Sequence, residues 1–252
     1  RYGTSDQLTV SNYFSSSVGY KVELFQFSDN ITWNEADIKS RVITKGDAAN
    51  NSITGYNDGT NRIYGFAGND NLSGGALADT IEGGVGNDTL SGGAGNDLLL
   101  GQDDSDTLYG GVGSDTLDGG IGSDLLSGDA GNDTYQLTIG SGSDTISDYD
   151  TVAGNSDTVV FSAVASTDLS ALERISNSLI LRYGATDTLT INNFFSGASY
   201  QVEQFNFSDG VTWSTSAINA AINTGLIRLP TEGSTWTGQS TADFVFGSSN
   251  AD

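Results

Sequence analysis

Hydrophobic residues recur at every ninth position between Gly65 and Gln136, and small or polar residues fill the places between them. The recurring apolar positions are Leu72, Ile81, Leu90, Leu99, Leu108, Leu117, Leu126 and Tyr135. Each is the centre of three residues, such as Thr89–Ser91, that have the pattern of a very short strand with one side chain pointing inward. The six glycine-rich residues between such strands predict a sharp turn. The repeating unit is therefore one strand and one turn.

Aspartate holds the sixth place of each nine-residue unit, two places before the apolar residue. These aspartates are Asp70, Asp79, Asp88, Asp97, Asp106, Asp115, Asp124 and Asp133. Glycine holds every first place and most second and fourth places; it permits positive φ and close backbone approach, so we expect turn carbonyls to point inward. The turn residues whose carbonyls we consider as metal ligands are Gly65, Gly68, Gly74, Gly83, Gly86, Gly92, Gly95, Gly101, Asp104, Gly110, Gly113, Gly119, Gly122, Gly128 and Gly131.

Two units, or eighteen residues, would close one coil of a flattened parallel β-roll. Stacked coils would place Asp70, Asp88, Asp106 and Asp124 in one column and Asp79, Asp97, Asp115 and Asp133 in another. A core one residue thick offsets little chain entropy, and stacked carboxylates repel one another, so we expect a cation between neighbouring aspartates. Carboxylate and carbonyl oxygens suit calcium better than magnesium, and the two columns predict about six ions or more.

The consensus GGxGxDxUx resembles the calcium-binding RTX (haemolysin-type) nonapeptide repeat. The resemblance implies an all-β fold, a right-handed parallel β-roll stacked on Ca²⁺. It also implies a segment of a bacterial exoprotein exported by type I secretion, unfolded in calcium-poor cytosol and rolled outside the cell. Without register, a Gly/Asp/Asn-rich tract would be disordered. Here we expect calcium to select between the disordered and the rolled form.

Residues 1–38 and 182–218 are copies of each other: RYGTSDQLTVSNYF corresponds to RYGATDTLTINNFF, and YKVELFQFSDNITW to YQVEQFNFSDGVTW. Alternating apolar residues predict antiparallel strands in each copy, and NEADIKSRV and STSAINAAI each predict a short helix. The copies resemble the haemolysin-type calcium-binding-related segment that flanks RTX repeats. We expect this block to cap the roll, because open strand edges invite aggregation and repeat arrays need atypical ends.

The chain is accordingly divided into a flanking segment (1–45), the roll (46–136), a C-terminal β-rich cap (137–224) and the start of a further array (225–252). Strands are also expected at 158–161, 171–175 and 179–183. The copied block recurs about 180 residues apart, which favours a larger parent with neighbouring repeat units as partners of this one.

Departures from the repeat identify weaker sites. Asn51 and Asn61 hold the acidic place in a looser stretch, Gly46 to Tyr64, where we expect weak calcium binding or none. Candidates for sites at the ends of arrays are Asn61, Asp144 and Asp243.

Two units interrupt the glycine pattern of the turns: Leu77 stands in a fourth place, and Gln102 with Asp104 in the second and fourth places of another unit. Because leucine tolerates positive φ poorly, we expect the least regular turn at 74–79.

The charge is unbalanced, with 9 Lys+Arg against 32 Asp+Glu and a formal net charge of −23. Fifteen acids and one base, Arg62, lie between Gly46 and Gln136, which excludes nucleic acid and anionic membranes as direct partners. The chain has no Cys and no His, so disulfides, thiolate or HExxH zinc sites and Ser/His or Cys/His nucleophile pairs are excluded. The turns lack a GKS or GKT motif and carry carboxylates, which disfavours a phosphate site, and no apolar run is long enough for membrane insertion.

The expected function is a calcium-dependent structural module, without enzyme activity of its own, in a large secreted or cell-surface bacterial RTX protein such as an adhesin, toxin or exoprotein. One alternative is an accessory module of a secreted RTX enzyme. A second is binding of extracellular glycans through Trp33, Trp213 or Trp236, although aromatic residues in strands are usually core residues. End-to-end self-association is a further alternative, because the array restarts after Thr237.

Overall fold

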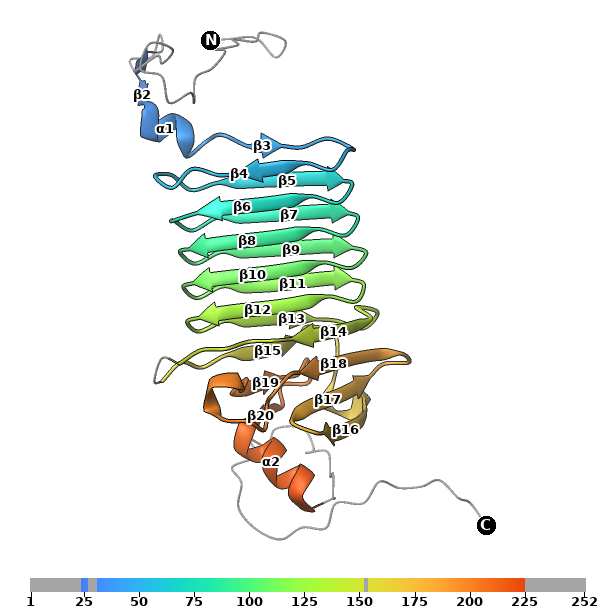
Figure 1. Ribbon diagram of the computed structural model, residues 1–252. Helices are drawn as coiled ribbons and strands as arrows, with labels where there is room; N and C mark the ends of the chain where they lie inside the picture. Colours follow the sequence, from blue (N-terminus) through green and yellow to red (C-terminus); the bar gives the residue numbers. More distant parts are fainter. Residues whose placement is uncertain (1–23, 27–30, 152–153, 225–252) are drawn as a thin grey trace.

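The computed structural model describes residues 24–26, 31–151 and 154–224. Sequence predictions that fall on other residues, including those for Asp243 and Trp236, lie outside the described residues. The described chain winds into a stack of flattened coils with a mixed β-structure at its lower end (Figure 1). The all-β prediction is confirmed.

The coils form two nine-stranded sheets within the described residues, ordered β16-β17-β18-β14-β12-β10-β8-β6-β4 and β20-β19-β15-β13-β11-β9-β7-β5-β3. The chain alternates between the sheets at every turn, so odd-numbered roll strands lie in one and even-numbered strands in the other. The roll strands are β3 (Thr44–Lys45), β4 (Ser52–Thr54), β5 (Arg62–Ala67), β6 (Asn71–Gly75), β7 (Thr80–Val85), β8 (Thr89–Ala94), β9 (Leu98–Asp103), β10 (Thr107–Val112), β11 (Thr116–Ile121), β12 (Leu125–Ala130), β13 (Thr134–Leu137), β14 (Ser143–Ile146) and β15 (Thr158–Phe161).

Neighbouring strands from β5 to β13 are parallel with partners eighteen residues apart, as the nine-residue period predicts. Leu90, for example, pairs with Leu72 on one side and Leu108 on the other. The eighth-place side chains of both sheets point into the roll and are 0% exposed. Burying one such aliphatic side chain contributes about 1.5–3 kcal/mol, so the core is continuous but thin.

The strands are longer than the predicted three residues. β8 covers six residues because Gly92 and Gly93 continue the ladder, and Gly93 pairs with Gly111. The turn therefore shrinks to a few residues around Asn96. The glycines also divide into two kinds: Gly93 and Gly95, at second and fourth places, have φ of +108° and +117°, whereas the first-place Gly92 does not require positive φ.

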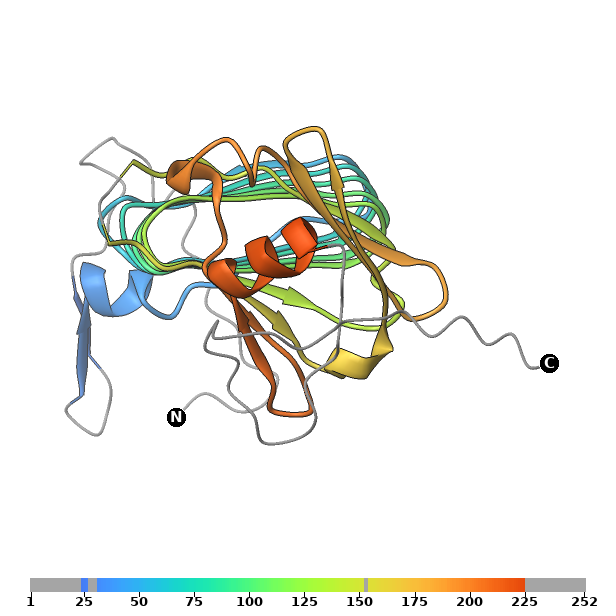
Figure 2. The same cartoon turned by 90° about the horizontal axis from the view of Figure 1, so that it is seen from below.

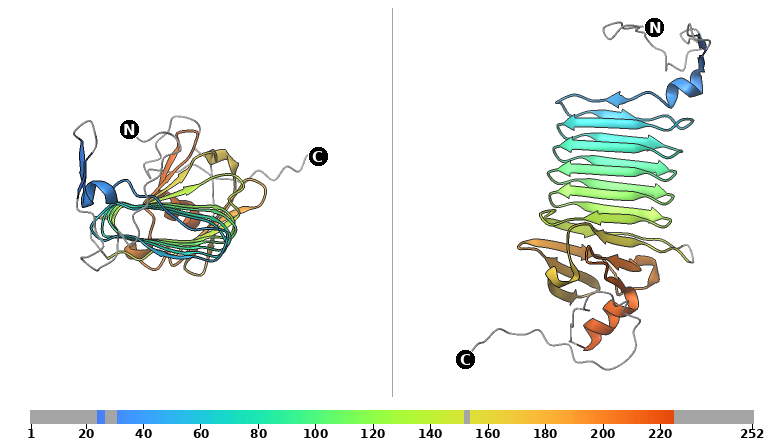
Figure 3. Two further views of the ribbon diagram at one scale, coloured as in Figure 1. Left: turned by 90° about the horizontal axis from the view of Figure 1, so that it is seen from above. Right: turned by 180° about the vertical axis from the view of Figure 1, so that it is seen from behind.

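A small unit precedes the roll. Strands β1 (Leu24–Gln26) and β2 (Thr32–Asn34) form an antiparallel pair, followed by helix α1 (Glu35–Lys39) where a helix is predicted. Asn34 caps α1, because its side chain accepts the Asp37 N–H while the Asp37 carboxylate accepts the Asn34 N–H. Lys39 at the other end of the helix pairs with Asp58 (2.6 Å) and Glu35 (2.9 Å), which places α1 beside the first coils (Figure 3).

The C-terminal segment closes the lower end of the roll. Strands β16 (Leu169–Ile175), β17 (Ser178–Tyr183) and β18 (Asp187–Ile191) are antiparallel to one another, as are β19 (Gln204–Asn206) and β20 (Thr212–Ser214), and each group extends one sheet of the roll. These bounds confirm the strands predicted at 158–161, 171–175 and 179–183. Helix α2 (Thr215–Thr224) follows β20 and lies across the open end (Figure 2).

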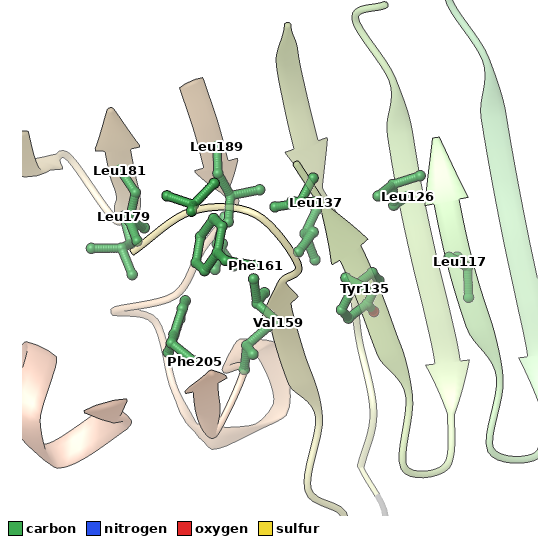
Figure 4. Packing of buried hydrophobic residues seen from close by; sticks show 14 of the residues in the cluster. Leu117, Leu126, Tyr135, Leu137, Val159, Phe161, Leu179, Leu181, Leu189 and Phe205 are labelled. Carbon is green, nitrogen blue, oxygen red and sulfur yellow. The ribbon is translucent and has the colours of Figure 1, made fainter. Parts of the chain in front are cut away.

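Aromatic side chains fill the interior of this cap. Phe161 stacks on Phe207 with ring centroids 4.9 Å apart, and Trp213 meets the edge of Phe207 at 5.1 Å. Phe161 and Phe205 continue the line of buried residues that begins inside the roll with Leu117 and Leu126 (Figure 4). One apolar core therefore runs through the roll and cap, and Trp213, at 6% exposed, belongs to it.

Candidate metal centre

The sixth-place aspartates stand in two columns, one at each edge of the roll where the chain turns between sheets. In each column the backbone N–H of one aspartate donates to Oδ1 of the aspartate eighteen residues on. Asp79 donates to Asp97 at 2.7 Å, and Asp97 donates to Asp115 at 2.7 Å. The same bond joins the members of the other column. The stacking of turns thus gives Oδ1 of each aspartate in the columns a backbone N–H donor, but it gives Oδ2 no such partner.

The second carboxylate oxygen of these residues is buried and unpartnered. Among the described residues, nine buried side-chain oxygens lack a hydrogen-bond partner, and all are aspartate Oδ2 atoms. They belong to Asp70, Asp79, Asp88, Asp97, Asp106, Asp115, Asp124, Asp133 and Asp144. Buried polar atoms without partners are rare and costly in proteins, so a repeated set of them indicates a missing positive partner.

Eight of the nine unpartnered oxygens, all except that of Asp144, lie beside a first-place glycine. A Cβ placed on Gly110 would lie 2.5 Å from Asp115 Oδ2 and 2.8 Å from the carbonyl oxygen of Gly128, one coil further on. We call this pair of oxygens beside a first-place glycine an oxygen cradle. In the described chain the pair recurs at six glycines, namely Gly65, Gly74, Gly83, Gly92, Gly101 and Gly110. Carboxylate and carbonyl oxygens together are the hard donor set that calcium prefers, so the residues present fit this ion.

The carbonyls considered as ligands therefore fall into two groups. First-place carbonyls of Gly83, Gly92, Gly101, Gly110, Gly119 and Gly128 point into the cradles, and those of Gly65 and Gly74 point at the glycines of the Asn51 and Asn61 turns, Gly46 and Gly55. Fourth-place carbonyls of Gly68, Gly95, Asp104, Gly113 and Gly122 instead approach the fourth-place position of the next coil. Gly86 and Gly131 also hold fourth places; the residue that follows Gly86 in its column is Asp104, and Gly131 belongs to the last nonapeptide unit.

Burial and mutual repulsion disfavour the charged form of the aspartates. Burial, together with repulsion from neighbouring aspartates of the same column and partly opposed by the N–H bond from the preceding coil, raises the pKa of Asp97 and Asp106 to about 7. Burial raises the pKa of Asp133 and Asp144 to about 7 as well. In the described part of the chain, no basic side chain is paired with these carboxylates. A cation in the cradles would supply the compensating charge.

The turns with asparagine in the acidic place are satisfied differently. The Asn61 side-chain Nδ2 donates to the carbonyls of Tyr56 (3.0 Å) and Gly59 (3.1 Å) and to Asp79 Oδ1 (2.9 Å), while its Oδ1 accepts the Tyr56 N–H. Asn51 likewise exchanges hydrogen bonds with Asp47. The side-chain amide of asparagine therefore donates its own N–H groups to the surrounding turn oxygens. An aspartate in the same place has no such donor and needs a separate positive group beside its carboxylate.

Of the two interrupted units, the one with Gln102 and Asp104 keeps the backbone geometry of the repeat, and the one with Leu77 does not. Gln102 and Asp104 adopt the positive φ of the glycines they replace, at 84° and 78°. Leu77 does not adopt positive φ; its side chain is 44% exposed and β6 ends two residues before it. The turn at 74–79 thus departs from the pattern, as expected, but Asp79 stays buried and its cradle at Gly74 is intact.

Both columns continue past the last nonapeptide unit. Asp124 donates its N–H to Asp144 Oδ1 at 3.2 Å, so the candidate end residue Asp144 extends one column with a twenty-residue step. Asp133 donates to Asp157 Oδ1 at 2.8 Å, and the Asp157 N–H donates to Glu203 Oε2 at 2.8 Å.

Sequence reasoning missed Asp157 and Glu203, because their spacings of 24 and 46 residues break the period. The triplet Ser-Asp-Thr, present at 105–107, 114–116, 143–145 and 156–158, is a signal that could have found Asp157.

Two family models match parts of the sequence. The model of the RTX calcium-binding nonapeptide repeat (4 copies) matches residues 45–81, 64–99, 73–108 and 100–135. The model of the haemolysin-type calcium binding protein related domain matches residues 2–37 and 179–217. No curated protein matches the chain. Among solved structures, the chain is similar to the extracellular lipase LipA from Serratia marcescens, with 16% identity and a TM-score of 0.24 over 57% of this chain and 36% of the lipase chain.

Proposed function

We propose that this chain, which carries RTX calcium-binding nonapeptide repeats between residues 45 and 135, is a calcium-dependent structural module of a secreted bacterial protein. Repeats of this kind bind calcium; the finer proposal concerns what the ions do here. The observation that carries it is the set of nine buried, unpartnered aspartate oxygens within the described residues.

We assign the side-chain ligands to the eight sixth-place aspartates and the backbone ligands to the carbonyls that face the oxygen cradles. Each cradle joins the carboxylate of one coil to the carbonyl of the next, so an ion held there would link successive coils. The six cradles correspond to about six ions, which would bring about twelve positive charges to a chain of formal net charge −23. Bound calcium supplies the positive charge that no basic side chain of the described residues provides.

The same geometry makes folding depend on the ion. Without a cation, stacking the coils brings buried carboxylates together and leaves their Oδ2 atoms unsatisfied, while a core one residue thick gives limited compensation. The roll segment is then disordered. Extracellular calcium modules typically bind at about 10⁻⁴–10⁻³ M, so this module would fold after export and remain a flexible chain inside the cell.

Circular dichroism of the whole chain during calcium titration tests this function. We expect a coil-like spectrum in chelator and a cooperative gain of strand on adding calcium, but not on adding equimolar magnesium. Asp106→Asn should shift the midpoint to higher calcium, whereas Asp103→Asn, which removes an exposed carboxylate on β9, is the matched control. A spectrum that is fully folded in exhaustive chelator would refute the proposal.

The roll has no enzymatic role in this proposal, and its place as an accessory module of a secreted enzyme is the second candidate for the parent protein. The described residues contain no helix long and apolar enough to cross a membrane. Glycan stacking on Trp213 is disfavoured because its ring packs against Phe207 inside the cap. The ring of Trp33 is partly exposed and has the Arg41 guanidinium 4.8 Å from its centroid, so Trp33 is the described residue to test on a glycan array.

A further inference from the structure

The last complete coil of the roll ends at a cluster of three buried aspartates. Asp133, Asp148 and Asp157 are 1%, 6% and 1% exposed. One carboxylate oxygen of each lies within 4.8 Å of those of the other two. Only Asp133 belongs to the nonapeptide units; the other two come from the segment between β14 and β15. The cluster is therefore built by the junction of roll and cap.

Asp133 shows independently that a partner is needed here. Its Oδ1 accepts the Asp115 N–H at 2.7 Å, but its Oδ2 is buried without any hydrogen-bond partner. The three atoms nearest to a Cβ on Gly128 all belong to Asp133, so the carbonyl that completes the six cradles above is not among them. Where the next nonapeptide turn would supply a carbonyl, the chain instead places Asp148 and Asp157.

Hydrogen bonds from the last turn orient both of these residues. Asp148 Oδ1 accepts the Asp129 N–H at 2.7 Å, and Asp157 Oδ1 accepts the Asp133 N–H at 2.8 Å. The buried Tyr135 hydroxyl accepts the Gly128 N–H at 2.9 Å and lies in hydrogen-bond contact with Asp148.

Tyr135 is the last of the eighth-place residues inside the roll (Figure 4). Leucine or isoleucine holds this place in the seven earlier units from Gly65, so the polar hydroxyl enters the roll only where the cluster begins.

The charges of the cluster are uncompensated by side chains. Ion pairs in the described ranges involve only Lys39, Arg41 and Arg182 as bases, and none of them reaches the cluster. The charged groups that act on Asp157 from its surroundings are Asp148, Asp133 and Glu203, and all three are acids. Three acids held together at neutral pH without a base are the arrangement that a divalent cation stabilises.

We propose that Asp133, Asp148 and Asp157 form a terminal divalent-cation site, with calcium as its ion. This site goes beyond the repeat function, because three carboxylates replace the carboxylate and carbonyl of the oxygen cradles. It also connects the roll to the cap, since the Asp157 N–H donates to Glu203, next to β19. Its higher negative charge predicts preference for more highly charged ions, including trivalent terbium.

Native mass spectrometry of the whole chain at saturating calcium tests the site by counting ions. Asp148→Asn and Asp157→Asn, made singly, should each bind one ion fewer than wild type, whereas the control Asp103→Asn should keep the wild-type count. An unchanged count in both variants would overturn the terminal site and leave the repeat function standing. A wild-type chain that binds no calcium would overturn both proposals.

A second variant covers the case in which loss of a buried carboxylate prevents folding. Tyr135→Phe keeps the ring and removes the hydroxyl next to Asp148, so the fold should survive. At one equivalent of terbium, we expect luminescence sensitised by the aromatic residues to fall by half or more in Tyr135→Phe but not in the control Tyr109→Phe, an exposed residue of β10. Equal emission from both variants would overturn the site.

Discussion

Asparagine at a sixth place should have opposite effects on the metal-free and the calcium-bound roll. Asp97→Asn keeps an Oδ1 that can accept the Asp79 N–H and replaces the unpartnered Oδ2 with an N–H donor. Asn61 shows what that donor does in the same place, because it binds two turn carbonyls and the next aspartate of its column. The variant should therefore stack without a cation at this turn and bind calcium less well.

The size of the stability gain expected in the metal-free roll follows from the environment of Asp97. Raising its pKa from 3.8 to about 7 corresponds to a penalty of about 4 kcal/mol for the charged form in the metal-free roll. Water at the turn surface screens part of this, so we expect a gain of ~2 kcal/mol on substitution. In calcium the change has the opposite sign, because a carboxylate ligand is lost from the column.

Two titrations followed by circular dichroism measure the change in stability without calcium and the change in calcium binding. In chelator, where the osmolyte trimethylamine N-oxide can drive folding, Asp97→Asn should fold at a lower osmolyte concentration than wild type. In a calcium titration it should fold at a higher calcium concentration. The control Asp103→Asn, which removes an exposed charge, should move neither midpoint by a comparable amount. If the osmolyte midpoint and the calcium midpoint of Asp97→Asn both rise, or both fall, relative to wild type, the cradle does not act as a cation site.

Three further outcomes are expected. Gly110→Ala would place a methyl group in a cradle and should raise the calcium concentration at the folding midpoint about tenfold. In the control Gly59→Ala, the new Cβ would lie 3.1 Å from the nearest atom, a side-chain carbon, so the midpoint should change by no more than about twofold. Equal shifts of the midpoint in both variants would contradict this prediction. Leu108→Ala should cost about 2–5 kcal/mol in urea unfolding at saturating calcium, because its side chain is 0% exposed. The raised pKa values of Asp97 and Asp106, about 7, mean that the metal-free roll is most stable below the ordinary aspartate pKa of 3.8 and loses this contribution as pH rises to about 7. Folding in chelator should need less osmolyte at about pH 5 than at about pH 8. The reverse order would refute the expected loss of stability with rising pH.

Particular residues show how far the sequence predicted the fold and the candidate site. The eighteen-residue coil, the two aspartate columns and the strands near 158–183 are as predicted, because period and alternation directly reflect stacking. The length of β8 was predicted wrongly, since a glycine that allows a turn also permits an extended strand, and only pairing with Gly111 selects the strand.

The amino-acid sequence by itself determined the repeat: which residues share a column, which point inward and which carry charge all follow from a nine-residue period. The tertiary structure decided how the columns end. Asp148 and Asp157 have no place in the period, and they reach Asp133 only because the chain folds back beneath the last turn. Distances between residues far apart in sequence depend on the path of the whole chain, and a local pattern does not contain that path.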